Sequence, residues 1–441
     1  MTKMDSRYIN KKSNSKKHFT ILGFALLWLV LDAEWLEWFF RETIFSSSIV
    51  VYFSFSLLLF LFLMVLGKNT ASVRNYNWIW IPYMVVTFLG YLFQLKFQKS
   101  IYWLVYLIII LISFKSNILK AAPLKIIFFS GLFAMIGVYV QFFFLPFWSA
   151  YIDVLFTYED KLDVIELGDA YGMNGFTYQQ GTTSIILMYG LIVWLYLKDE
   201  VLPDLRVLKI SHLLLALLMI IAVFLTGKRM MSLVVFFVPL LVYFFSKNRG
   251  SKRFITAGVI CLLLFIVYKT ILPDLLATSD IFFFKRMAVT LDAAKSGESV
   301  DALTTGRQYL GELAIKAWQD SPIFGIGIGL YQEYTHAYSE AHNTYLQILC
   351  EQGLVGFCLY ITAILYYLLL TLRLMNSTKC TLHKQYLKAS LAMQLVYILY
   401  GLSGNVNIGL CPPLYVLGVA VAIRVSYLEK SLRNEITAYT R

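Results

Sequence analysis

Charged residues are scarce in this chain of 441 residues. They make up 15% of the sequence, whereas a soluble protein carries about 25%. Hydrophobic residues make up 59%. This composition excludes a soluble enzyme, a disordered chain and a fibrous repeat.

Cysteine and histidine are also rare, with five of each. The cysteines form no CxxC pair and lack zinc-ligand spacing, and we expect them to be small core residues (Cys261, Cys350, Cys358, Cys380 and Cys411). No two histidines have metal-ligand spacing, and the sequence offers no Ser-His-Asp arrangement. Hydrolysis by a metal or a catalytic triad is therefore disfavoured, and we expect no metal and no other cofactor.

Long apolar runs dominate the chain instead. A spanning helix needs about 20 mostly apolar residues, and the sequence holds twelve candidates: 19–39, 44–66, 77–95, 100–114, 124–147, 181–197, 210–226, 229–246, 254–272, 346–372, 385–404 and 409–427. The runs are continuous rather than alternating, which excludes a transmembrane β-barrel. The sequence predicts an all-α polytopic membrane protein with about twelve transmembrane helices.

The basic residues predict the orientation of these helices. The formal net charge is +12, but the basic residues lie in short clusters between apolar runs, as beside anionic lipid, so no nucleic-acid partner is expected. About two-thirds of the Lys and Arg residues lie in or beside segments that are cytoplasmic if the N-terminus is inside. The start of the chain reads as a basic cytoplasmic head, not a cleavable signal peptide.

The resulting organisation has five parts. We expect a cytoplasmic N-terminus (1–18), nine helices (19–272) with an outer loop at 148–180, a large outer loop between helices 9 and 10 (273–341), three further helices (342–427) and a cytoplasmic C-terminus (428–441). Loops longer than about 12–15 residues are often functional.

The large outer loop carries a helical pattern of its own. Thr305 and Gln308 fit a capping box, and Ser321-Pro322 ends the pattern. Between them, apolar residues recur at helical spacing (Leu310, Leu313, Ala314 and Ala317). This predicts an amphipathic helix on the outer membrane face or against the bundle. A purely structural cover helix is the alternative.

Two basic sites lie where basic residues are disfavoured. Lys228 and Arg229, in LTGKRMMSL, fall at the predicted outer ends of two spans. They either snorkel to lipid headgroups or bind an anionic lipid-linked substrate. Arg307 lies on the first turn of the predicted outer helix, on the side of its apolar stripe. A guanidinium there needs an anion, which is either an acidic side chain or a phosphate.

The most informative segment is SPIFGIGIGLYQEYTHAYSEAHNTYLQILCEQGLVG. Its alternating glycines permit close backbone approach to a ligand or a helix (Gly325, Gly327 and Gly329). Asn343, Gln347 and Glu351 follow at helical spacing and predict a polar stripe that faces the bundle interior or lines a wet cavity. His342 stands at the top of this stripe. Imidazole titrates near neutral pH, which suits a general base; a hydrogen-bonded structural histidine is the alternative.

These motifs resemble the O-antigen ligase/polymerase family of bacterial membrane glycosyltransferases. The resemblance rests on residues 306–356, from Gly306-Arg307 through SPIFGIGIG to AHNTYLQILCEQGLVG, and on TGKRMMSL, which places Arg229 on the family's arginine. Lys228 departs from the pattern, because the family more often has a small residue there. The loop at 148–180 matches only in part.

The resemblance implies a GT-C-like membrane fold and transfer of a glycan from an undecaprenyl-diphosphate donor to a glycan acceptor. It implies action on the outer face of the bacterial inner membrane, without nucleotide sugar or metal, beside other polysaccharide-assembly proteins. Arg229 and Arg307, with Lys228, would bind the donor diphosphate, and His342 would activate the acceptor hydroxyl. In this mechanism the arginines stabilise the leaving diphosphate.

Three functions remain open. A polymerase would extend lipid-linked repeat units into a surface polysaccharide such as O-antigen, capsule or exopolysaccharide. A ligase would transfer the glycan to a lipid core or a protein. A non-catalytic flippase would only move the lipid-linked glycan, and it would not need an outer loop bearing arginine and histidine. The abundance of Lys, Asn, Ile, Phe and Tyr hints at an AT-rich genome and, through a single-membrane cell, favours the polymerase.

Overall fold

The computed structural model describes residues 79–96, 99–100, 103–104, 121–152, 166–167, 170–177, 180–202, 209–246, 284–285, 287–288, 306–406 and 411–439. Three predicted spans lie outside these residues, as does nearly all of a fourth (19–39, 44–66, 254–272 and 100–114). Within the described chain, the one sheet pairs β1 (Glu166–Leu167) with β2 (Ala170–Tyr171) in antiparallel fashion. Helices make up most of the rest.

Most helices of the described chain follow the predicted apolar runs. The described helices are α5 (Trp80–Phe93), α7 (Ala121–Phe143), α8 (Leu145–Phe147), α10 (Gln180–Val201), α11 (Lys209–Leu225), α12 (Arg229–Ser246), α17 (Arg307–Asp320), α18 (Tyr331–Thr335), α19 (Thr344–Ser377), α20 (Thr381–Tyr400) and α21 (Cys411–Tyr439). Of these, α17 and α18 lie in the predicted loop at 273–341. The helix α12 has the bounds expected from its apolar run. The helix α21 continues past the predicted end at residue 427, through the expected cytoplasmic tail.

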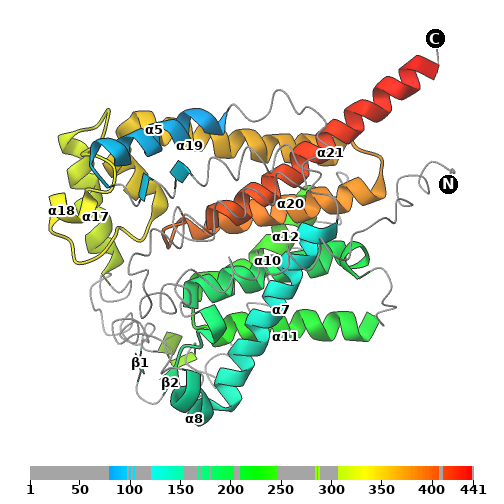
Figure 1. The fold of residues 1–441 in the computed structure, drawn as a ribbon, viewed down its shortest axis with the longest axis horizontal. Coiled ribbons are helices and arrows are strands. Elements are labelled where there is room, and N and C mark those ends of the chain that lie inside the picture. Colours follow the sequence, from blue (N-terminus) through cyan, green and yellow to red (C-terminus); the bar gives the residue numbers. More distant parts are fainter. Residues whose placement is uncertain are drawn as a thin grey trace, which may run out of the picture.

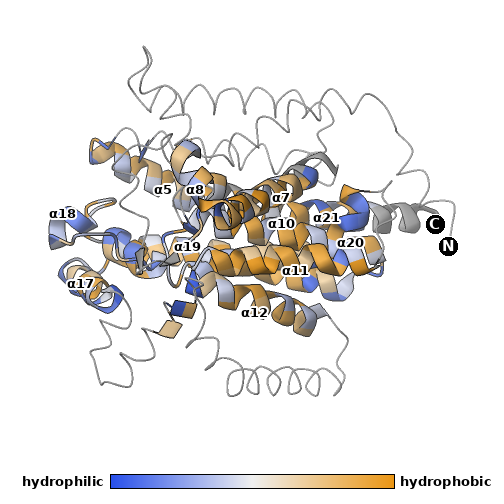
Figure 2. Cartoon of the chain, turned by 90° about the horizontal axis from the view of Figure 1, so that it is seen from below, coloured by the Kyte–Doolittle hydropathy of each residue, from blue (hydrophilic) through white to orange (hydrophobic). Residues whose placement is uncertain are grey.

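Several helices are suited to a bilayer. Among the described residues, α10, α12 and α19 are long and apolar enough to cross a membrane, and α7 with its continuation, bent by 102°, is a fourth candidate. The helix α11 exposes large apolar side chains such as Ile210 and Leu213, which suits contact with lipid. In Figure 2 the ribbons of α11 and α12 are mostly orange, for hydrophobic residues, whereas α17 and α18 carry more of the hydrophilic blue. The described chain is therefore a helical membrane protein.

The helix α10 forms the centre of the bundle, because most of its side chains are buried. It packs closely against α7 where Gly131 meets Gly190: a Cβ atom on either glycine would lie 2.7 Å from the Cα atom of the other. Small residues at such a crossing let two membrane helices approach along their backbones. In Figure 1, α10 lies between α20 and α7.

The loop that follows α7 is held against the bundle. It contains two short helical turns (Trp148–Ile152 and Gly175–Thr177) and the β1–β2 pair. The side chain of Gln141 accepts hydrogen bonds from the backbone N–H groups of Asn174 (2.7 Å) and Gly175 (2.9 Å). This part of the predicted outer loop is thus anchored to α7.

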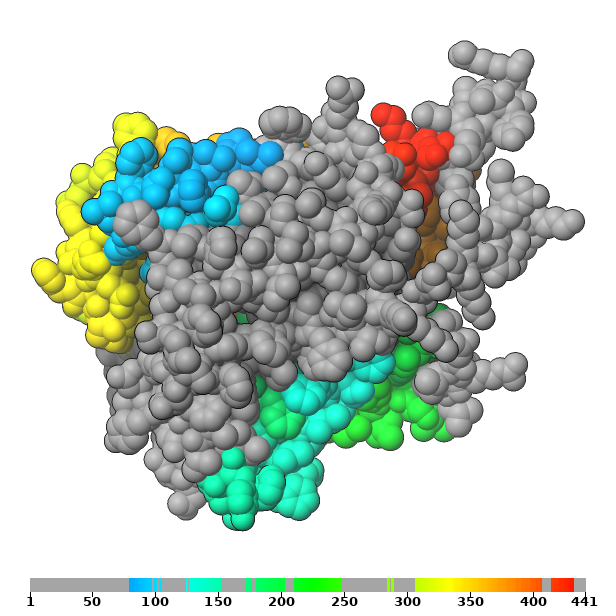
Figure 3. Space-filling view, viewed as in Figure 1, coloured from blue at the N-terminus to red at the C-terminus, as the bar shows by residue number. Residues whose placement is uncertain are grey.

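The helix predicted after Thr305 is confirmed as α17, which ends at Asp320 immediately before Ser321. Its inner side is buried in a small second core with the start of α19 (Ala314, Ala317, Tyr331, Ala341 and Cys350). The regions of α17 and α18 lie at the end of the molecule opposite the C-terminal end of α21 (Figure 1). Figure 3 shows that their yellow surface adjoins the blue surface of α5.

Two expectations from the sequence need comment. The structure begins α17 after Gly306, which is its N-cap with a φ angle of 78° and no side-chain capping bond, and Gln308 donates to Glu312 at 2.9 Å. Thr305, the other residue of the predicted capping box, lies outside the described residues. A glycine can adopt this left-handed conformation at little cost. The cysteines are also not uniformly buried, because Cys350 is buried but Cys358 is exposed.

Candidate functional site

The site is built around a break in α19. The helix changes direction at Gly353, which has a φ angle of 62° and a ψ angle of −164°. The segment 322–327 lies along this break and bonds to its backbone. Ile326 N–H donates to Cys350 O (3.0 Å) and Gly327 N–H to Glu351 O (3.1 Å), while Pro322 and Ile323 accept from the two residues after Gly353. The segment before α19 therefore completes the hydrogen bonding of the broken helix.

The alternating glycines make this close approach possible. A Cβ atom on Gly325 would collide with the backbone of Glu351, and one on Gly353 would collide with the backbone of Ile323. Both glycines have positive φ angles. The predicted close backbone approach is confirmed, and its partner in the structure is a helix of the same chain.

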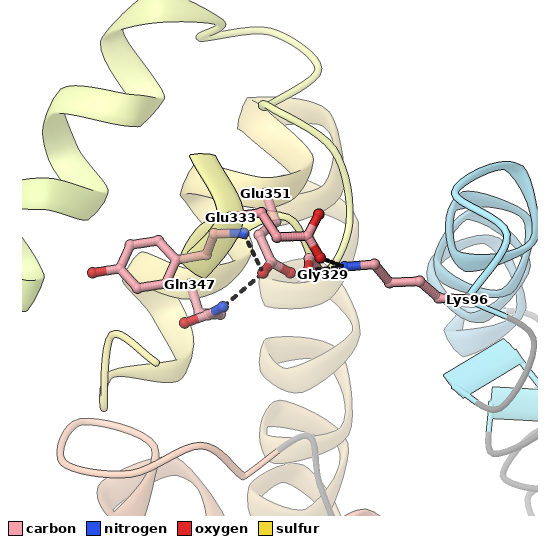
Figure 4. A network of polar contacts seen from close by, with 6 residues as sticks. Lys96, Gly329, Glu333, Gln347 and Glu351 are labelled. Atoms are coloured by element: carbon pink, nitrogen blue, oxygen red, sulfur yellow. Dashed lines mark hydrogen bonds and ion pairs between the residues drawn. The ribbon is translucent and has the colours of Figure 1, made fainter. Parts of the chain in front are cut away.

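Two buried polar side chains of α19 accept hydrogen bonds from the backbone of the loop (Figure 4). Gln347 Nε2 donates to Glu351 Oε1 at 2.6 Å, and Gln347 Oε1 accepts from the backbone N–H of Ala341 at 2.9 Å. Glu351 Oε1 also accepts from Tyr331 N–H at 3.4 Å. Gln347 and Glu351 thus face inward, as predicted, and fix the backbone next to His342. Their lining of a substrate cavity stays a prediction.

The helix α5 and the turn after it, which carries Lys96, contact the same loop. Lys96 Nζ pairs with Glu333 Oε1 at 2.7 Å and donates to the backbone oxygen of Gly329 at 2.6 Å (Figure 4). Gly90 of α5 also lies against Ile328, with no room for a Cβ atom between them. The loop is therefore clamped between α5 and α19.

His342 lies in the turn that enters α19. Its φ angle is 48°, which is rare for a residue other than glycine, and its Nε2 atom lies 3.1 Å from Ser339 Oγ. The next residue, Asn343, is the N-cap of α19: its Oδ1 atom accepts from the N–H groups of Tyr345 (3.0 Å) and Leu346 (3.2 Å). The Asn343 side chain therefore caps the helix, and its predicted place in a cavity lining is a proposal only.

The His342 turn is docked on the turn that follows α20. Thr344 N–H donates to Gly401 O at 2.9 Å, and Thr344 Oγ1 donates to Gly404 O at 2.8 Å. Asn405 Nδ2 donates to Glu340 Oε2 at 2.6 Å. A strained backbone conformation held from several sides is typical of functional sites.

The predicted basic residues gather at the same end of the bundle. Arg229 is the first residue of α12 and Arg307 the first residue of α17. The two guanidinium groups are close enough for electrostatic repulsion, and Arg307 also interacts electrostatically with Tyr400, which precedes Gly401. Burial lowers the pKa of Arg307, so an anion beside it would be stabilising. No carboxylate of the described chain forms an ion pair with Arg307.

Lys228 belongs to this group as well. A Cβ atom built on Gly181, the second residue of α10, would lie 2.7 Å from the Tyr400 hydroxyl oxygen and 3.6 Å from Lys228 Cε. The first residues of α10, α12 and α17 therefore lie near a group of three cationic side chains. Helix N-termini and cations both favour a negatively charged ligand. The arrangement is suited to binding a diphosphate.

Tyr400 and Gly401 thus relate Lys228 and Arg307 to the turn that bears His342, and Arg229 lies near Arg307. Three residues of this region were not predicted from the sequence: Tyr400, Gly181 and Ser339. Tyr400 stands in an apolar run, where an aromatic residue carries no functional signal, and Gly181 is one glycine among 25. Ser339 is three residues before His342, and this proximity was the one available signal.

The comparison with protein families agrees with this geometry. The family model described as O-antigen ligase matches residues 214–361, a range that contains the two basic sites, α17 and the His342 turn. No curated protein matches the chain. The match supports the assignment of this chain to the O-antigen ligase/polymerase family.

Proposed function

We propose that the protein is an outer-face glycosyltransferase that polymerises undecaprenyl-diphosphate-linked oligosaccharide units into a surface polysaccharide. One observation carries the proposal: Lys228 and Arg307 lie near Tyr400 and Arg229 lies near Arg307, while Gly401, the residue after Tyr400, accepts a hydrogen bond from the turn that bears His342. The cations are suited to a diphosphate leaving group, and the His342 turn to activation of a hydroxyl. Transfer of a lipid-linked glycan needs both.

In the proposed reaction, Lys228, Arg229 and Arg307 bind the donor diphosphate. His342 accepts the proton of the attacking acceptor hydroxyl, whose oxygen forms a bond with the anomeric carbon. The bond between that carbon and the phosphate oxygen breaks, and its electron pair leaves with the undecaprenyl diphosphate. The cations stabilise the negative charge that develops on this group. The proton on His342 then passes to water.

A ligase is the second candidate, because the matching family is described as O-antigen ligase. The two activities share donor chemistry and differ in acceptor. A polymerase transfers the growing glycan to another lipid-linked repeat unit, whereas a ligase transfers it to a lipid core or a protein.

Reconstitution with a defined donor tests the proposal. Purified protein in liposomes, given a radiolabelled lipid-diphosphate oligosaccharide, is expected to yield a ladder of longer lipid-linked glycans, with one undecaprenyl diphosphate released for each bond formed. Product that appears only after addition of a lipid core or protein acceptor would identify a ligase. Movement of the labelled lipid across the bilayer without any new glycosidic bond would support a flippase and overturn the proposal.

We further propose that both termini are cytoplasmic and that the loop before α19 is outside. In a cysteine-free background, a small impermeant maleimide should label Ser299→Cys in intact cells. It should label Ser246→Cys, at the other end of α12 from Arg229, only after permeabilisation. The positive-inside distribution of Lys and Arg is the reason. The reverse labelling pattern would contradict this orientation.

A further inference from the structure

Tyr400 occupies a place that only a glycine at position 181 leaves open. Its hydroxyl oxygen lies 2.7 Å from where the Cβ atom of any larger residue at that position would be, which is closer than real contacts allow. Lys228 Cε lies 3.6 Å from the same point. The Tyr400 hydroxyl therefore sits at the N-terminus of α10, beside Lys228.

The ring of Tyr400 is held from the other side as well. A Cβ atom on Gly404 would lie 3.0 Å from the ring, and Ser403 N–H donates to Tyr400 O at 2.9 Å. Two glycines thus border the side chain, and the turn after α20 fixes its backbone. The position of the hydroxyl is set by packing before any ligand binds, which lowers the entropic cost of using it.

The charges around this hydroxyl are positive. Lys228 is adjacent through Gly181, Arg307 interacts with Tyr400 electrostatically, and the α10 N-terminus adds the positive end of a helix dipole. Lysine and arginine are positively charged hydrogen-bond donors. The hydroxyl of tyrosine is an uncharged donor that can also bond to a phosphate oxygen. A phosphate in this region would therefore meet a neutral donor together with the cations.

We propose that Tyr400 is a further binding residue of this site, and that its hydroxyl donates a hydrogen bond to a phosphate oxygen of the lipid-linked diphosphate. This inference rests on the proposed function and adds a residue to its donor site. The role of Gly181 follows from it: glycine is required there because a side chain would displace the hydroxyl.

Tyr400→Phe is the first test, with farnesyl diphosphate as the binding probe for detergent-purified protein. A hydrogen bond to a charged group is worth about 10–100-fold in affinity, and we expect a loss of that size. Binding of farnesol, which lacks phosphate, should not change. Tyr139→Phe is the matched control, because it removes a partly buried hydroxyl that donates to Leu218 O at 2.9 Å in another part of the bundle. This variant should bind the probe as wild type does.

Gly181→Ala separates binding from a purely structural role. The added methyl group displaces the Tyr400 hydroxyl, so this variant should lose affinity to a similar extent while its melting temperature stays near that of wild type. In a Tyr400→Phe background the same change should have no further effect, because the hydroxyl is gone and the ring carbon that bore it lies 3.9 Å from the new Cβ atom. The two substitutions should therefore be strongly non-additive.

Wild-type affinity in Tyr400→Phe, or additive losses in the double variant, would overturn the inference. If Arg307→Ala then still loses the probe, the proposed diphosphate site stands without Tyr400. If Arg307→Ala and Arg229→Ala also bind the probe as wild type does, the proposed function fails as well.

Discussion

His342→Ala is expected to lower the rate of glycan transfer by about 10²–10⁴-fold, the usual contribution of a general base. The alanine variant has no group to accept the proton of the incoming hydroxyl, while the basic site that binds the donor is unchanged. His342→Gln should not restore the rate, because an amide cannot take up the proton. Turnover by purified protein with lipid-diphosphate donor and acceptor, alongside donor binding, measures the effect.

The hydrogen bond between Ser339 Oγ and His342 Nε2 provides a graded control. Ser339→Ala removes the group that orients the imidazole but leaves the imidazole itself, so its loss of rate should be smaller than that of His342→Ala. If His342→Ala keeps normal turnover and instead loses folding or membrane level, the histidine is structural and the base assignment is wrong.

Arg307→Ala and Arg229→Ala are each expected to abolish detectable polymer in cells while the protein remains in the membrane at near-normal level. Removal of one donor to a developing anion typically costs about 10²–10³-fold in rate. Arg→Lys at either position should restore activity only in part, because an ammonium group cannot form the two parallel hydrogen bonds of a guanidinium. The measurements are the chain-length distribution of surface polysaccharide and the level of the membrane protein.

Lys316→Ala is the matched control for Arg307→Ala. Lys316 lies on the same helix, α17, but its side chain is exposed, so its removal should leave the polymer unchanged. Full activity in both arginine variants would remove the diphosphate-binding role of this cluster. Equal loss in Lys316→Ala would point instead to a general effect of positive charge on α17.

Local patterns predicted well the helices that the structure describes. The apolar spacing after Arg307 led to the bounds of α17, and it also placed Arg307 on the packed side, where the structure has it half-buried. The basic pair before an apolar run likewise placed Arg229 at the start of α12. These features depend on residues within one or two helical turns, so periodicity is sufficient to find them.

Most features that depend on distant residues were not predicted. The apolar run at 346–372 gave no sign that α19 breaks at Gly353, because the break is satisfied by a segment about 30 residues earlier. Asn343 was placed in a polar stripe by spacing alone, but its side chain bonds to the nearest free backbone N–H groups. Tyr400 acquires its place only through contact with Gly181, on a separate helix.

One set of hydrogen bonds to α19, at the Gly353 break, comes from residues that precede the helix in sequence. The other set, at Thr344, comes from residues that follow it. The segment 322–327 precedes the helix that it completes, so it has already been synthesised when the break at Gly353 forms. The partners of Thr344 lie at 401–406, after α20, so the His342 turn has its full set of hydrogen bonds only once that helix has been made. During synthesis the segment 322–327 can therefore dock before the site is complete, and the nascent chain bears an unfinished His342 turn until α20 takes its place in the bundle.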